Sequence, residues 1–415
     1  MIEPNNLVAS KRTLAILFGT LLLNMVGFGM IFPIIPIIFT DPSSPSFVLH
    51  GYSQGAQFFI TGAITALWGL MQFIAAPILG QLSDMFGRKK LLQLCIGVLA
   101  PSQLLFGLGI SVASVLLLFI ARAIAGLAAG SLAITQATIA DVTTPQNRAK
   151  SFGLIGAAIG LGLILGPLLS GWIAGLTGSS VTPFWVAGFL GFVNLLFVAL
   201  LLPETSPRSK ATQKFSLLGG VSNIRTAVQD SRARSIYLAY FFYVCGFAIL
   251  TSFSGVFLVR AMKFSAGNVG TAFAFAGVCQ IFAQLVLLRR LVPRHSERAI
   301  LRYSLLVSGF CVATFAFFPN LPAWIIFTVL ITVPHGLTLP NLSALVSKGA
   351  AADKQGVALG ISASLLALSN AVAPLLAGTI SGFLGLAAPF VVGGLLISGA
   401  WTIIQICSPH PIEAV

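Results

Sequence analysis

Twelve apolar stretches, each long enough to cross a lipid bilayer, recur along this chain and constrain its fold more than any other feature. A bilayer core about 30 Å thick is crossed by about 20 apolar residues in a helix. Only 8% of the residues are charged and 57% are hydrophobic, which excludes a soluble globular fold. We therefore predict an all-α polytopic membrane protein with twelve transmembrane helices, at residues 13–39, 57–79, 91–110, 115–140, 152–176, 183–203, 236–259, 269–291, 300–318, 322–345, 356–383 and 385–407.

Lysine and arginine are distributed unevenly between the segments that connect these stretches. If the N-terminus is cytoplasmic, 20 of the 23 Lys and Arg residues fall on the cytoplasmic side, and Arg260 and Lys263 fall outside. Cytoplasmic loops of membrane proteins carry such an excess, so both termini are expected in the cytoplasm. The same distribution explains the net charge of +14 without nucleic-acid binding.

The chain also divides near its middle and repeats itself. A polar segment over 204–235 separates a first bundle, 1–203, from a second, 236–415, and reads as a cytoplasmic linker. Small residues and a proline recur at an offset of 207 positions, where Gly153, Gly162, Gly166, Pro167 and Gly171 correspond to Gly360, Ser369, Ala373, Pro374 and Gly378. This repeat predicts two pseudo-symmetric six-helix bundles with a substrate site between them.

The loop after the second stretch carries one acid and three bases in the spacing G-x-x-x-D-x-x-G-R-K-K, from Gly80 through Asp84, Gly87 and Arg88 to Lys90. Gly80 and Gly87 permit a tight turn, and Asp84 can face an arginine or a helix N-terminus. This loop resembles the signature loop between helices 2 and 3 of major facilitator superfamily transporters. The alternative is a loop that only sets the topology.

Helix 5 carries Gly153, Gly162, Gly166, Pro167 and Gly171, which resemble the antiporter motif of drug/proton antiporters, with Ser170 in place of a second glycine. Small residues let helices approach closely, and a role in packing alone is the alternative. Helix 1, from Asn24 through Phe28 to Pro36, is similar to the tetracycline/proton antiporter branch of the drug/proton antiporter-1 group. That branch usually has Asp at the position of Asn24.

This resemblance implies a secondary transporter in the bacterial inner membrane, acting as a monomer. It would export a small amphipathic molecule by alternating access, with protons co-transported. It also implies a charge latch made by Asp84, Arg88 and Asp141 that closes the cytoplasmic side. The remaining candidates for substrate or proton coupling are Asn24, Phe28, Arg122, Gln136, Tyr240, Tyr243, Gln280, His335 and Asn370.

Arg122 and His335 are the two candidates that can carry charge inside a span. An intramembrane arginine costs about 2.5–3.5 kcal/mol on insertion scales, so Arg122 either faces a wet cavity or extends to the outer surface. His335 either carries a proton or is a hydrogen-bonded structural residue. Pro334 and Gly336 beside it predict a helix break.

None of the nine acids lies deep in a span, so the usual carboxylate for proton exchange is missing. This favours a second hypothesis, a facilitator or importer of a small metabolite, including an anionic one, without carboxylate-based proton coupling. No G-x-S-G, H-E-x-x-H or P-loop motif is present, so we expect neither an enzyme nor an ATP-driven pump. The five cysteines have no paired spacing, and we expect no metal or cofactor.

Overall fold

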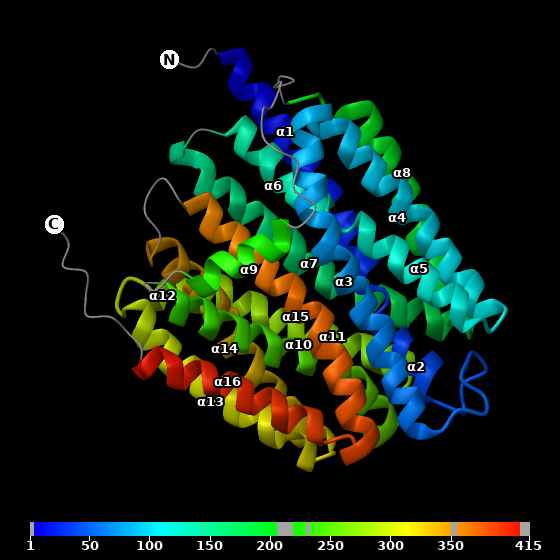
Figure 1. Cartoon of the computed structure of the whole chain (residues 1–415). Coiled ribbons are helices and arrows are strands. Elements are labelled where there is room, and N and C mark those ends of the chain that lie inside the picture. Colours follow the sequence, from blue (N-terminus) through cyan, green and yellow to red (C-terminus); the bar gives the residue numbers. More distant parts are fainter. Residues whose placement is uncertain (1–3, 144, 206–218, 230–232, 350–354, 407–415) are drawn as a thin grey trace. The chain divides into compact units, whose positions relative to one another are not determined.

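The computed structural model describes residues 4–143, 145–205, 219–229, 233–349 and 355–406, and in these ranges it contains helices and no strand (Figure 1). Twelve helical segments are long and apolar enough to cross a membrane, and each overlaps one of the twelve predicted stretches. Lipid offers no water to backbone N–H and C=O groups, so a chain of this composition satisfies them within helices. The predicted fold class and number of spans are confirmed.

The chain forms two compact units that exchange the ends of two helices. Unit 1 comprises residues 1–52, 67–219 and 264–277, and unit 2 comprises residues 53–66, 220–263 and 278–415. The helix α3 (Gln54–Phe86) therefore begins in unit 2 and ends in unit 1. The helix α11 (Ala266–Phe282) begins in unit 1 and ends in unit 2.

Unit 1 is built mainly from the first half of the chain. In it α1 packs along α7, and α4 packs along α8 (Figure 1). Its core contains aliphatic side chains from several helices of the unit, such as Leu17, Leu92, Ile134 and Val198. Besides its parts of α3 and α11, unit 1 contains α1 (Pro4–Gly29), α2 (Ile34–Thr40), α4 (Arg88–Ser111), α5 (Val115–Ala128), α6 (Ser131–Val142), α7 (Pro145–Thr177) and α8 (Thr182–Leu201).

Two spans of unit 1 are interrupted, which the hydrophobic pattern alone did not predict. The first span breaks between Gly29 and Ile34, beside Pro33, whose ring nitrogen has no hydrogen to donate. The Ser170 hydroxyl of α7 donates a hydrogen bond of 2.5 Å to the carbonyl of Met30, the first residue of this break. The fourth span breaks at Ala129 and Gly130, between α5 and α6.

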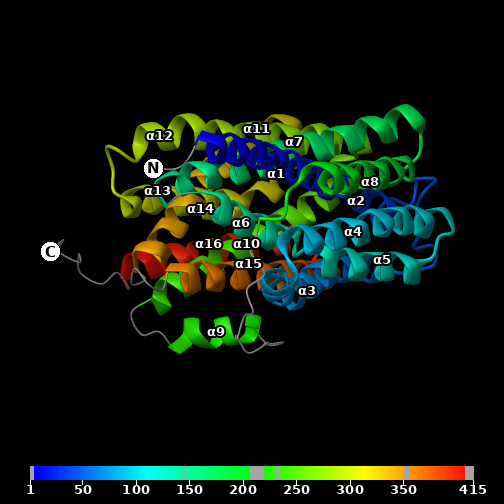
Figure 2. The same ribbon diagram turned by 90° about the horizontal axis from the view of Figure 1, so that it is seen from above.

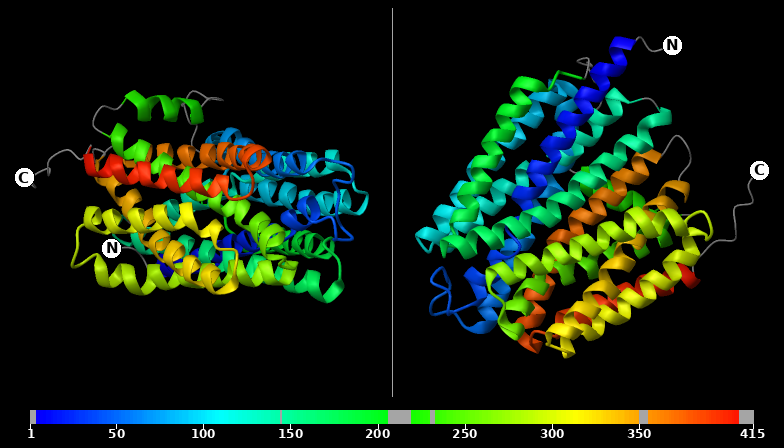
Figure 3. Two further views of the ribbon diagram at one scale, coloured as in Figure 1. Left: turned by 90° about the horizontal axis from the view of Figure 1, so that it is seen from below. Right: turned by 180° about the vertical axis from the view of Figure 1, so that it is seen from behind.

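Unit 2 contains most of the second half of the chain. In it α16 packs along both α10 and α13 (Figure 3), around a core that includes Phe253, Leu305, Phe390 and Ile397. Besides its parts of α3 and α11, unit 2 contains α9 (Gly219–Gln229), α10 (Arg234–Met262), the π-helical turn η1 (Ala283–Leu287), α12 (Leu288–Leu291), α13 (Glu297–Thr314), the 3₁₀ turn η2 (Phe315–Phe317), α14 (Leu321–Gly349), α15 (Gln355–Leu384) and α16 (Ala388–Ile406).

The predicted helix break beside His335 is wrong. The helix α14 runs without interruption from Leu321 to Gly349, although it contains Pro334 and Pro340. Proline removes one backbone hydrogen bond, but side chains and neighbouring helices can satisfy the freed group in a transmembrane helix. In the turn after this proline, the Thr338 hydroxyl also donates to the carbonyl of Pro334 at 2.8 Å, which adds a side-chain hydrogen bond to the helix.

The short helix α9 lies within the polar segment between the two bundles. Figure 2 shows it apart from the long helices of unit 2, on the side of α15. The side-chain amide of Asn223 donates to the Ser364 hydroxyl of α15 at 2.9 Å, and Ala227 is buried, whereas Val221 and Val228 are exposed. One face of α9 is therefore held on α15, and the opposite face is open.

Candidate functional site

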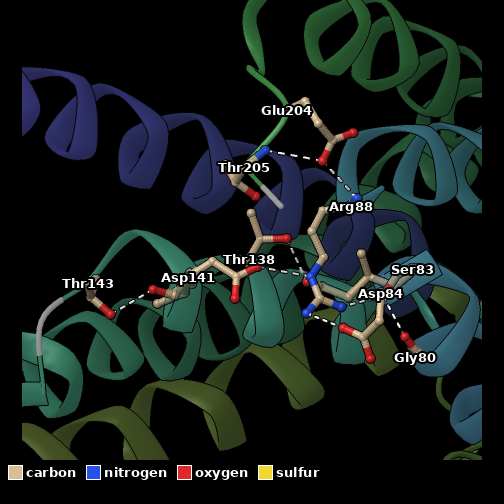
Figure 4. A network of polar contacts seen from close by, with 11 residues as sticks. Gly80, Ser83, Asp84, Arg88, Thr138, Asp141, Thr143, Glu204 and Thr205 are labelled. Atoms are coloured by element: carbon tan, nitrogen blue, oxygen red, sulfur yellow. Dashed lines mark hydrogen bonds and ion pairs between the residues drawn. The ribbon is translucent and has the colours of Figure 1, made fainter. Parts of the chain in front are cut away.

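Arg88, the first residue of α4, is the centre of a polar network at one end of unit 1 (Figure 4). Its Nη2 lies 2.5 Å from Asp84 Oδ1 of α3, and its Nε lies 3.0 Å from Asp141 Oδ2 of α6. Its Nη1 donates to the Ser83 hydroxyl at 2.5 Å. Each nitrogen of the guanidinium thus has its own partner, an arrangement that only the planar fork of arginine allows. The predicted residues Asp84, Arg88 and Asp141 lie together.

The turn between α3 and α4 explains why Arg88 is held in this position. The helix α3 ends at Phe86, and Gly87 alone connects it to α4 with a φ angle of 100°, which strongly favours glycine. Gly80 lies inside α3 rather than in the turn, and its carbonyl accepts the Ser83 hydroxyl at 2.7 Å. The prediction that both glycines form the turn is therefore right for Gly87 and wrong for Gly80.

Glu204 is a member of this network that the sequence analysis did not select. It follows α8, and its Oε1 accepts the backbone N–H of Arg88 at 2.9 Å (Figure 4). The N-terminus of a helix carries unpaired N–H groups and a partial positive charge, so a carboxylate there is stabilising. A methyl group at Gly87 would lie 2.5 Å from Glu204 Oε2, so a larger residue there would require the Glu204 carboxylate to move.

The network is only partly shielded from solvent. The Arg88 side chain is 10% exposed, but the side chains of Asp84 and Asp141 are 43% and 30% exposed. Exposed ion pairs contribute only about 0–1 kcal/mol to stability, so such contacts can break and reform at modest cost. Three helix ends and the segment after α8 are joined by contacts that are specific in geometry and weak in energy.

The glycines of the antiporter-type motif bring α7 against two neighbours. A methyl group at Gly166 would lie 2.5 Å from the Val26 carbonyl oxygen and 2.8 Å from Gly29 Cα, and Gly162 packs on Met25. Further along, Gly171 packs on the first turns of α11, where a methyl group would lie 2.6 Å from the Ala266 carbonyl oxygen. Gly153 lies earlier in α7. Close approach of helices is therefore the physical role of this motif.

The contact between α7 and α11 in unit 1 has a counterpart in unit 2. Gly270 of α11 packs against the Pro167 carbonyl of α7, and Gly62 of α3 packs against the Pro374 carbonyl of α15. Pro167 and Pro374 are the equivalent prolines of the sequence repeat. The same small-residue crossing is therefore built once in each unit, which gives the repeat a structural meaning.

Arg122 lies in the middle of α5 and is only 3% exposed. Its guanidinium carbon lies 5.8 Å from the centre of the Trp68 ring, and its Nε has no hydrogen-bond partner among the described residues. The Trp68 ring in turn packs on Phe28 at a centroid distance of 4.7 Å. Arg122 therefore does not extend toward the outer surface. It is a buried cation beside aromatic rings, and the structure shows no carboxylate paired with it in the described part of the chain.

Asn24, where the resembling branch has an acid, lies at the contact of α1 with α8. Its Oδ1 accepts the side-chain amide of Asn194 at 3.0 Å, and the same amide donates to the Thr20 carbonyl at 3.2 Å. Both asparagines are buried. In the structure Asn24 thus takes part in a polar contact between two helices of unit 1.

Several candidates from the second half gather in unit 2. Tyr243 Oη of α10 lies 2.5 Å from His335 Nδ1 of α14, and Tyr240 is buried one turn before Tyr243. The backbone of Gln280 in α11 packs against Gly336, the residue after His335. A methyl group at Gly336 would lie 2.8 Å from the Gln280 carbonyl oxygen. Asn370 is half-buried on α15, and Gln136, in unit 1, is exposed on α6.

The candidates therefore form an ionic network and an arginine–aromatic group in unit 1, and a histidine–tyrosine group in unit 2. Sequence reasoning missed Ser83, Glu204 and Trp68. Ser83 stands beside Asp84, and Glu204 is the first acid after the sixth span. These positions are the only signals in the sequence that could have indicated these two residues. Among the described residues no three His, Cys, Asp or Glu side chains are placed to hold a metal ion.

Twelve spans, a repeated small-residue crossing and an ionic network at helix ends define the class of protein as a polytopic membrane transporter. The family model of the Major Facilitator Superfamily matches residues 17–233 and 236–407. The chain belongs to the Major Facilitator Superfamily.

Individual relatives are similar over nearly their whole length. The chain is 26% identical over 407 residues to the tetracycline resistance protein, class C, of Escherichia coli, covering 95% of this chain and 98% of that protein. It is 26% identical over 421 residues to major facilitator superfamily domain-containing protein 10 of Mus musculus, covering 92% and 90%. It is 27% identical over 375 residues to multidrug resistance protein 1 of Bacillus subtilis (strain 168), covering 89% of each.

Solved structures share the fold. The human organic anion transporter MFSD10 (TETRAN) aligns with a TM-score of 0.73 at 24% identity, over 95% of this chain and 99% of that one. The nucleoside transporter NupG (D323A mutant) aligns with a TM-score of 0.70 at 15% identity, over 95% and 98%. At these identities the likeness concerns the fold.

Proposed function

We propose that this transporter exports a small amphipathic molecule in exchange for protons, by alternating access, from the cytoplasm of a bacterial cell. The proposal is supported by the names of relatives, which include tetracycline and multidrug resistance proteins. It places both termini in the cytoplasm, as the distribution of lysine and arginine favours, and treats the protein as a monomer.

The observation that carries the proposal is the network around Arg88. A transporter that alternates between two states needs contacts that hold one state firmly and can be released without unfolding a helix. Arg88 joins the ends of α3 and α6 through partly exposed carboxylates, and Glu204 adds the segment after α8. We assign Gly80, Asp84, Gly87, Arg88 and Asp141 to this conformational switch.

Transport of tetracycline into everted membrane vesicles tests the proposal. Vesicles energised with an inside-acid proton gradient should accumulate tetracycline, and an agent that collapses the gradient should abolish the accumulation. Accumulation that is unaffected by collapsing the gradient would remove proton coupling, and absence of any accumulation would remove tetracycline-type export.

A second candidate function is a facilitator or importer of small organic anions. It is favoured by Arg122, a buried cation without an acidic partner among the described residues, and by the relative described as an organic anion transporter. An anionic ligand would supply the missing counter-charge. Uptake of fluorescein by proteoliposomes without a proton gradient would favour this function over drug export.

A further inference from the structure

In the histidine–tyrosine group of unit 2, the imidazole ring of His335 is contacted at one edge and on one face. Tyr243 Oη lies 2.5 Å from His335 Nδ1. The ring of Phe247, one turn after Tyr243 in α10, is parallel to the imidazole within 2°, with 3.4 Å between the ring centres. His335 is 7% exposed and Tyr243 is fully buried. The imidazole therefore has one defined position, and only its Nε2 edge is without such a contact.

The contact with Tyr243 determines which ring nitrogen carries the proton. No carboxylate is paired with His335 among the described residues, and an isolated charge at this depth is costly, so the ring is neutral here. A phenol is a good donor and an unprotonated imidazole nitrogen is a good acceptor, so Tyr243 donates to Nδ1. The proton of the neutral ring then resides on Nε2.

Nε2–H is consequently a donor without a partner among the described residues. Nε2 is not one of the fully enclosed polar atoms that lack a hydrogen bond, so this donor is accessible to a small molecule. Phe247, which stacks on the imidazole, and Gln280 are both only half-buried. The side-chain amide of Gln280 is likewise without a hydrogen bond to a described residue.

The tyrosine is itself held from a third helix. Thr338 lies beside the Tyr243 hydroxyl, and its hydroxyl oxygen is 2.8 Å from the Ser304 hydroxyl of α13. Groups behind a binding residue that fix its tautomer and orientation are typical of sites prepared for a ligand. A histidine used only for packing does not require this support.

We infer that His335 is a substrate-binding residue whose Nε2–H donates to an oxygen acceptor of the transported molecule. The acceptor is a carbonyl, enolate or carboxylate oxygen. The rest of the ligand is aromatic or apolar, because Phe247 covers one face of the imidazole and the buried Tyr240 lies one turn before Tyr243 in α10. Tyr243 is a positioning residue that keeps the proton on Nε2. This inference rests on the proposed function and names the chemistry that the substrate must carry.

The ring nitrogens of His335 can be observed directly. The chain has four histidines. Protein labelled with ¹⁵N-histidine and placed in nanodiscs should therefore give one pair of resonances that disappears in His335→Gln. We expect the Nε2-protonated tautomer, a shift of Nε2–H on adding millimolar tetracycline or fluorescein, and a change of tautomer in Tyr243→Phe. A proton on Nδ1, or the absence of a shift with both probes, would overturn the inference whatever the transport activity.

Transport kinetics separate this inference from the proposed function. His335→Leu should raise the KM for tetracycline about tenfold, because the donor is lost, whereas His335→Gln, which keeps a side-chain N–H, should recover part of it. Thr332→Val is the matched control, since Thr332 is a buried residue of the same helix whose hydroxyl donates to the Thr328 carbonyl and contacts Cys279 rather than His335. An unchanged KM in His335→Leu would refute the binding role while leaving export intact. Wild-type vesicles that fail to accumulate tetracycline would refute export, and the nitrogen shifts would still decide the binding role.

Discussion

Arg88 and Asp141 are 53 residues apart in the sequence, yet Arg88 Nε lies 3.0 Å from Asp141 Oδ2. The same guanidinium pairs with Asp84 through a different nitrogen, so two carboxylates compete for one cation. Such a cluster gives little stability because it is partly solvated, but it orders three helix ends with respect to one another. The predictions below separate these two effects.

Replacing Asp84 by asparagine should reduce transport about tenfold or more, because the pair with Arg88 is lost at the proposed switch. Stability should change by less than about 1 kcal/mol, since Asp84 is 43% exposed. Transport in vesicles and thermal unfolding in detergent check both. Asp41→Asn is the control, because the Asp41 side chain accepts hydrogen bonds from Ser43, two residues away, and lies outside the network around Arg88. Wild-type transport by Asp84→Asn would contradict the switch role.

Glu204 should act on stability as well as on transport, because its carboxylate caps α4 at the N–H of Arg88. Glu204→Ala removes the charge and the acceptor and should cost about 1 kcal/mol, as for other helix N-caps. Glu204→Gln keeps an acceptor oxygen and should cost about half as much. The unfolding midpoints should therefore fall in the order wild type, Gln, Ala. Equal midpoints would show that the cap contributes nothing.

Arg122→Ala should reduce transport without destabilising the protein. A buried cation without an acidic partner costs free energy in the folded state, so its removal should leave the unfolding midpoint unchanged or raise it. Arg260→Ala serves as the comparison, because Arg260 also lies over an aromatic ring, that of Phe58, at 6.0 Å. A large loss of stability in Arg122→Ala would instead mean that Arg122 is a structural residue.

Gly166→Ala should destabilise the protein by about 1–3 kcal/mol, because the added methyl group would overlap the Val26 carbonyl and Gly29 of α1. Gly175→Ala in the same helix should be neutral or slightly stabilising, since no atom lies within 4 Å of the added group and alanine favours a helix. Unfolding midpoints of the two variants measure the difference. Similar unfolding midpoints of the two variants would show that the close contact of α7 with α1 at Gly166 does not contribute to stability.

The sequence by itself determined the number of spans and the repeat. Both follow from local composition: a stretch such as 91–110 is too apolar to be soluble and long enough to cross a bilayer, whatever surrounds it. The correspondence between Pro167 and Pro374 was also visible, because identical residues at a fixed offset can be recognised in the sequence without a structure. The turn at Gly87 was also predictable, since few other residues adopt its φ angle.

Only the tertiary structure decided which polar groups meet. Glu204 accepts a hydrogen bond from Arg88, which is 116 residues away in the sequence, and Ser170 donates one to Met30, which is 140 residues away. No local sequence pattern encodes contacts at such separations. The continuity of α14 through Pro334 was likewise not encoded locally, because a transmembrane helix can tolerate the backbone hydrogen bond that a proline removes. Hydrophobicity acts on each segment separately, whereas a hydrogen bond between helices exists only once packing has brought donor and acceptor together.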